Sequence, residues 1–217
     1  MPAPLSRRAR HSPQRPGRRE RKRAETRERI FRAALALFVE RGFAATTVED
    51  ITEAADVGKG TFFNYFPSKE HVLAAFPEMQ VGKLKGVVAG LRETRQSIRE
   101  VMRSLVHKLA EEPGRSPALV RAILGANLSS APVRALVLGH MKRGWAALGE
   151  MYALGQRRGE VRRDVTPLQL AQATHQMFFG TLLLWAIEPS ETLRDRLEHA
   201  FELFWPGIRA AGARGKE

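Results

Sequence analysis

Residues 46–70 read TTVEDITEAADVGKGTFFNYFPSKE, and this stretch decides how the rest of the chain is interpreted. Thr46 and Glu49 have the spacing of a capping box, a pattern that starts a helix. We expect a further short helix over about 58–66, because Pro67 excludes helical geometry from the residue before it. Two short helices joined by a tight turn over 47–66 predict a helix-turn-helix.

The outward face of the second short helix indicates what the motif binds. At about 100° per residue, Phe62 and Phe66 turn toward the core. Gly60 and Asn64 then lie on the opposite side, and Phe63 points partly outward. Asparagine can pair with adenine, an apolar edge can meet a thymine methyl, and glycine lets another backbone approach. This face therefore predicts recognition of base edges in the major groove of DNA.

The flanking sequence is helical throughout. A first helix over about 26–41 carries one apolar face, and Gly42 can end it with Phe43 folded back on Phe38. A fourth helix follows the motif, and Pro77 is expected to kink or split it. No alternating β-branched run predicts a strand, so the expected fold class is all-α. Further helices are expected over about 97–110, 116–128, 132–158, 166–187 and 191–209.

The chain divides into an arm, two helical domains and a tail. Residues 1–23 are rich in Arg, Pro and Ser with few apolar side chains, which predicts a disordered basic arm. This arm is interpreted either as an idle solvated tail or as a source of extra phosphate contacts. We assign 24–76 to a helix-turn-helix DNA-binding domain and 77–210 to a larger helical domain for ligand binding and dimerisation. Residues 211–217 are expected to form a frayed tail.

Composition limits the possible functions. The formal net charge of +13 favours nucleic acid or an acidic membrane surface as a partner. The chain has no cysteine, no Gly-rich phosphate loop after a strand and no paired-histidine motif, so we expect no catalytic residues, no metal site and no cofactor. The longest apolar run, 177–187, has about half the length of a membrane span, and no signal peptide is recognisable. We therefore expect a cytoplasmic protein.

The stretch 46–70 resembles the DNA-binding domain of TetR/AcrR-type transcriptional regulators, and the resemblance covers about residues 24–76. The family pattern has Thr-Thr-Val at a helix start, then Gly-Val-Ser-Lys-Gly-Thr-Leu-Tyr, then Tyr-Phe and Ser-Lys-Glu. This chain departs from that pattern at Asp56, Gly58 and Phe63, which replace glycine, serine and tyrosine. Aspartate tolerates left-handed geometry and glycine is an acceptable cap, so the turn is expected to survive.

The resemblance implies DNA contacts for eight residues. Thr47 would cap the second helix and contact phosphate; Lys59, Gly60, Phe63 and Asn64 would meet the major groove; and Thr61, Tyr65 and Lys69 would hold the DNA backbone. It also implies a four-helix bundle between two subunits, built from helices 166–187 and 191–209. Charge introduced at Leu183 or Phe201 is expected to break that dimer.

The C-terminal domain is larger than dimerisation needs, which suits a ligand cavity between its helices. Most of its apolar side chains are nevertheless expected to be ordinary core, and its four histidines to be surface or satisfied residues without metal-ligand spacing. The candidates for ligand contact are Leu105, Ile123, Leu124, Trp145, Leu148, Met151, Met177 and Phe178.

The sequence therefore predicts a homodimeric, sequence-specific transcription regulator rather than an enzyme. We expect a repressor that leaves a palindromic operator when an unknown small-molecule effector binds. Its expected partners are double-stranded operator DNA, a second copy of the chain and that effector, with no membrane. The alternative is a basic protein that binds membrane surfaces or nucleic acid without sequence preference or ligand control. Binding to anionic vesicles would distinguish the two.

Overall fold

The computed structural model describes residues 17–91 and 95–211, and within these ranges the chain forms α-helices and no β-strand. This confirms the all-α prediction. Residues 1–16 of the arm predicted over 1–23 and residues 212–217 of the tail predicted over 211–217 lie outside the described residues. Residues 18–23 of that arm form the start of a helix rather than a disordered segment. The elements are α1 (Arg18–Arg41), α2 (Val48–Ala54), α3 (Lys59–Phe63), α4 (Lys69–Leu91), α5 (Ile98–Ala110), the 3₁₀ turn η1 (Pro113–Arg115), α6 (Pro117–Ser129), α7 (Ala131–Arg158), α8 (Pro167–Ile187) and α9 (Leu193–Ile208).

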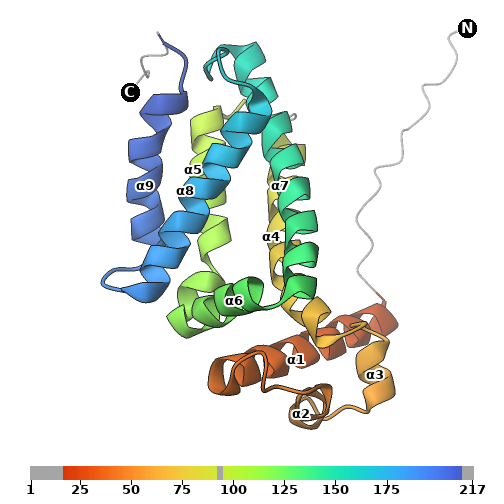
Figure 1. Ribbon diagram of the computed structural model, residues 1–217. Helices are drawn as coiled ribbons and strands as arrows, with labels where there is room; N and C mark the ends of the chain where they lie inside the picture. The colour runs from red at the N-terminus through yellow and green to blue at the C-terminus, as the bar shows by residue number, and fades with distance from the viewer. Residues whose placement is uncertain (1–16, 92–94, 212–217) are drawn as a thin grey trace, which may run out of the picture.

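The first three helices form a small N-terminal domain at the base of the molecule (Figure 1). Its core is built from aromatic and aliphatic side chains such as Phe38, Ile51 and Phe62, all at most 1% exposed. The same core includes Phe76 of α4 and Ile123 of α6. The N-terminal domain is therefore not closed by its own helices alone, because α6 packs against α1 and completes it.

The larger domain is a bundle into which α4 rises from the small domain (Figure 1). Helix α4 packs along α7, α7 along α8, and α9 against both α8 and α5. One glycine is required by this packing. A Cβ on Gly155 would lie 2.6 Å from Val161 Cγ2 and 2.8 Å from Ile98 Cγ1, so only glycine lets the end of α7 fit there.

Helix boundaries follow the sequence expectations in most places. The bounds of α5 to α9 lie within two residues of those predicted from periodicity and proline positions. One expectation was wrong, because helix α1 begins at Arg18 rather than near Thr26. Helix α4 continues through Pro77, so this proline does not split the helix, and the kink that was the other expectation stays a prediction.

Membrane-span criteria are met by no single helix of residues 17–91 and 95–211. Helices α6 and α7 meet them only when taken together across a bend of 108°.

Candidate DNA-binding surface and effector cavity

The start of α2 is fixed by a capping box that differs by one residue from the predicted one. The Thr47 hydroxyl accepts a hydrogen bond from the Asp50 backbone N–H, and Asp50 Oδ2 accepts one from the Thr47 N–H at 2.8 Å. The hydrogen bonds that the Thr47 hydroxyl and the Thr47 N–H donate to the Asp50 carboxylate hold the pKa of Asp50 below its usual value. The pairing of Thr46 with Glu49 was wrong because Thr46 is buried, where its hydroxyl donates to Gly42 O at 2.8 Å.

The turn between α2 and α3 depends on Asp56, which has a φ of 49°. Asp56 is the one non-glycine residue with positive φ in the described ranges, and aspartate adopts this left-handed geometry more readily than most residues. Beyond the turn, Gly58 caps α3 in an extended conformation. The aspartate and glycine that depart from the family pattern are thus accommodated as the sequence predicted.

Helix α3 presents the face expected from its periodicity. Phe62 is fully buried, whereas Phe63 is 53% exposed and Asn64 is also exposed. Gly60 is exposed, and a Cβ built on it would meet nothing within 4 Å, so its surroundings are open. A glycine, a bare aromatic ring and an exposed amide therefore lie on one outward surface.

Charged and polar groups border that surface. Lys59 forms an ion pair with Glu49 of α2, which lowers the pKa of Glu49. Thr61 and Tyr65 are half-buried, and the guanidinium of Arg23 lies 6.0 Å from the centre of the Tyr65 ring. The first turns of α1 thus lie beside α3, a proximity that sequence periodicity did not predict.

Lys69 has a structural role that sequence reasoning missed. Its ammonium donates to the backbone carbonyls of Phe43 at 2.9 Å and Thr46 at 2.8 Å, with Ala44 O at 3.4 Å. It also lies 4.7 Å from the centre of the Phe43 ring. Lys69 therefore ties the start of α4 to the connection between α1 and α2.

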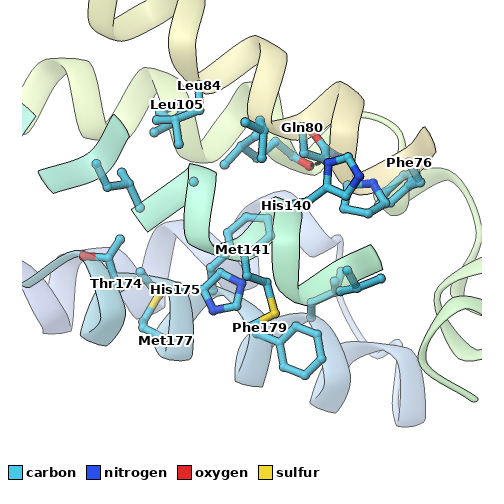
Figure 2. Close-up of a pocket in the computed structure, with 18 of the residues that line it drawn as sticks. Phe76, Gln80, Leu84, Leu105, His140, Met141, Thr174, His175, Met177 and Phe179 are labelled. Carbon is cyan, nitrogen blue, oxygen red and sulfur yellow. Dashed lines mark hydrogen bonds between the residues drawn. The ribbon is translucent and has the colours of Figure 1, made fainter. Parts of the chain in front are cut away.

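A cavity of about 180 Å³ lies in the larger domain between α4, α5, α6, α7 and α8 (Figure 2). Two of the eight predicted ligand residues, Trp145 and Met151, are not part of its lining. Met151 is fully buried in the bundle core, and Trp145 packs beside His175. The six that do line it are Leu105, Ile123, Leu124, Leu148, Met177 and Phe178.

The polar side chains of the cavity were not predicted as ligand candidates. Gln80 of α4 and Asn127 of α6 both line it, and each has a buried side-chain oxygen without a hydrogen-bond partner. His140 and His175, which were expected to be ordinary surface or satisfied residues, also line it. Helical periodicity marks these positions only as inward or outward, so it carries no signal for a cavity wall.

Both cavity histidines favour the neutral form. Burial lowers the pKa of His140, and the neighbouring Arg143 guanidinium, which lies 2.8 Å from His140 Nδ1, lowers it further. Burial lowers the pKa of His175, whose ring stacks on Phe179. Among the described residues that line the cavity, none carries a charged carboxylate, ammonium or guanidinium group.

Helices α8 and α9 expose apolar side chains on the outer side of the bundle. Leu183, Leu184 and Ile187 of α8 are 39%, 61% and 66% exposed, and Leu203 of α9 is 85% exposed. Phe201, which was expected at this surface, is fully buried in the bundle core. Charge at Phe201 would therefore disrupt folding, so it cannot report on subunit contacts.

Comparison with known proteins agrees with this arrangement. The profile of bacterial regulatory proteins of the tetR family matches residues 30–76. The HTH-type transcriptional regulator TcmR of Streptomyces glaucescens is 49% identical over 63 residues, which are 29% of this chain and 28% of that protein. The HTH-type transcriptional repressor KstR of Rhodococcus jostii (strain RHA1) is 25% identical over 183 residues, 82% of each chain.

A solved structure extends the similarity to the whole fold. Thermus thermophilus FadR, a TetR-family transcriptional repressor crystallised with lauroyl-CoA, is 33% identical with a TM-score of 0.63. The match covers 87% of this chain and 99% of that one, so it includes both the N-terminal domain and the helical bundle. This chain belongs to the TetR family of bacterial transcriptional regulators.

Proposed function

We propose that this regulator is a repressor, that it reads a palindromic operator as a homodimer, and that a small molecule in the cavity releases it. The observation that carries the proposal is the outward face of α3, where Gly60, Phe63 and Asn64 are exposed together. Asparagine and an apolar edge are groups that distinguish base pairs in the major groove. Lys59, Thr61 and Tyr65, which border this face, and the exposed Thr47 at the start of α2 are proposed to contact the DNA backbone. Lys69 is not included among the proposed DNA contacts, because its ammonium group already donates hydrogen bonds to backbone carbonyl groups.

Homodimer formation is proposed through α8 and α9. Leu183, Leu184 and Ile187 are exposed within the last turns of α8 and Leu203 is exposed on α9, and exposed apolar side chains of this size often mark protein–protein contacts. A two-fold pair of recognition helices reads two half-sites at fixed spacing, so the operator is expected to be palindromic.

Effector control is proposed because the cavity touches the core of the DNA-binding domain. Phe76 of α4 and Ile123 of α6 line the cavity and also belong to the N-terminal core. A molecule that binds better to one arrangement of α4 and α6 shifts the position of α1 and α3. The lauroyl-CoA in the complex of the Thermus relative supports the idea that a protein of this fold takes a small-molecule ligand, here one with an apolar acyl chain.

The test of DNA reading is the Asn64→Ala variant on an operator selected from random duplexes with the unmodified protein. We expect the variant to lose about 1–3 kcal/mol of binding free energy on the operator, because it no longer recognises one base in each half-site. Its affinity for random DNA should stay unchanged. The matched control is Gln96→Ala, an exposed amide outside the first three helices, which should change neither affinity. An equal fall on operator and random DNA would instead favour binding without base recognition.

A further inference from the structure

The cavity holds an acceptor whose direction is fixed by the protein. Gln80 Nε2 donates to the backbone carbonyl of Leu109 at 3.3 Å, which sets the orientation of the amide. Its Oε1 is buried and has no hydrogen-bond partner in the protein. In Figure 2, Gln80 lies near Phe76 and His140, at the end of the cavity where α4 meets α7.

A second acceptor lies on α6. Asn127 Oδ1 is likewise buried without a partner, and Asn127 lines the same cavity. Thr174 differs from both, because its hydroxyl is within 2.5 Å of the Tyr152 hydroxyl and 2.8 Å of Leu170 O. The wall therefore includes two amide oxygens without a hydrogen-bond partner, and an amide oxygen accepts hydrogen bonds but cannot donate them.

A buried hydrogen-bond acceptor without a partner destabilises the protein, because it has lost its hydrogen bonds to water. A ligand that donates a hydrogen bond to it removes this penalty. The remaining wall is almost entirely apolar, and its two histidines are held neutral by burial. An anion would enter without a countercharge and would lose its hydration. A cation would face no carboxylate among the lining residues that the structure describes.

We propose that the cavity selects a neutral, largely apolar molecule that carries a hydroxyl group, which donates a hydrogen bond to Gln80 Oε1 or Asn127 Oδ1. This inference rests on the proposed function of the cavity as the effector site and adds the chemical class of the effector. An apolar cavity of about 150 Å³ holds benzene. The cavity of about 180 Å³ is therefore suited to a molecule of one or two rings.

The test uses four probes of one shape, titrated by calorimetry into the full-length protein at neutral pH. These are 2-naphthol, naphthalene, 2-methoxynaphthalene and 2-naphthoate. We expect 2-naphthol to bind about tenfold more tightly than both naphthalene, which is smaller, and 2-methoxynaphthalene, which is larger and cannot donate. The anion 2-naphthoate should bind at least about a hundredfold more weakly than 2-naphthol.

The hydroxyl preference is then measured in the Gln80→Met/Asn127→Leu double variant. Here the preference means the ratio of the dissociation constants of 2-methoxynaphthalene and 2-naphthol. It should fall several-fold, because the two amide oxygens no longer accept the hydroxyl proton and the neutral imidazole of His175 is the main acceptor left in the described wall. The control is Gln156→Met, which removes a partly buried amide bonded to Arg162 O and Val165 O outside the cavity, and it should keep the preference. Since the ratio compares two ligands on the same variant, a modest loss of stability does not imitate the result.

The outcomes separate this inference from the proposed function. A preference that is unchanged in the double variant, or equal affinity for all four probes, overturns the selection of a hydroxyl group by the two amide oxygens. Binding of 2-naphthol with the expected preference supports the inference even if the protein–operator complex is unaffected, and that result would contradict effector control instead. The Asn64→Ala variant tests DNA reading independently of both.

Discussion

At the scale of single residues, the ammonium of Lys69 is bonded within the protein rather than available to DNA. Three carbonyls from 43, 44 and 46 gather around it. We expect Lys69→Met to lower the free energy of unfolding by about 1.5–3 kcal/mol, because the hydrogen bonds to a charged donor disappear and the carbonyls are left without this partner. Urea denaturation followed by circular dichroism measures the change.

The control for Lys69→Met is Lys85→Met, an exposed lysine on the same helix. Its replacement should change the free energy of unfolding by no more than about 0.5 kcal/mol. Equal stability of the two variants would contradict the structural role of Lys69. The sequence could not reveal this role. A lysine near a recognition helix is expected to contact DNA, and only the fold brings the carbonyls of a separate segment to its ammonium group.

At the scale of elements, α1 extends about two turns beyond the predicted start. Its first residues are mostly arginine, lysine and glutamate, which form helices well even without an apolar face. The Gly17 N–H donates to Glu20 Oε2 at 2.9 Å at the start of the helix. Periodicity could not detect this segment because none of its side chains is buried. The helices from α5 to α9 were predicted well because prolines and capping residues mark their ends.

The extended start of α1 should contribute to the salt dependence of DNA binding. Arg23 lies beside Tyr65 next to α3, and Arg18, Arg19 and Arg21 are exposed in the preceding turns of the same helix, with Arg19 on the face of Arg23 and the other two turned away from it. Replacing these three with glutamine should flatten the slope of log affinity against log salt by about 1–3, because each phosphate that the protein neutralises adds about 0.9 to the slope. A titration of fluorescent duplex from low to moderate salt measures the slope.

The matched control for that experiment replaces three exposed cations of the larger domain, Lys85, Lys142 and Arg157, with glutamine. The net charge changes by the same amount, but the slope should stay close to that of the unmodified protein. An equal flattening in both variants would show that overall charge rather than the start of α1 is responsible.

At the scale of the whole molecule, the outer surface of α8 and α9 should decide the oligomeric state. We expect Leu184→Glu combined with Leu203→Glu to give a monomer by sedimentation at micromolar concentration, because both leucines are highly exposed in the single chain. Operator affinity should fall at the same time, since one recognition helix contacts one half-site. Leu128→Glu is the control, because Leu128 is 80% exposed on α6 and should leave the dimer intact.

The molecule as a whole also shows where prediction from sequence ends. The motif over 47–66 and its outward face could be derived from spacing and helical geometry, because those depend on neighbours along the chain. The cavity could be derived only in part, because its walls come from five helices and a void differs from a packed core only in three dimensions. Gln80 and Asn127 were missed for this reason.

The wall that the cavity shares with the N-terminal core has a consequence for how this regulator can diverge. Substitutions at Phe76 or Ile123 would alter the proposed effector site and loosen the N-terminal core together. Selection for a new inducer would therefore meet an immediate cost in operator occupancy at those two positions. His175 and Met177 of α8 line the cavity but do not belong to the N-terminal core, so substitutions there would change the cavity alone. Paralogues that respond to different compounds should consequently vary most along α8, while the side of the cavity formed by Phe76 and Ile123 changes slowly.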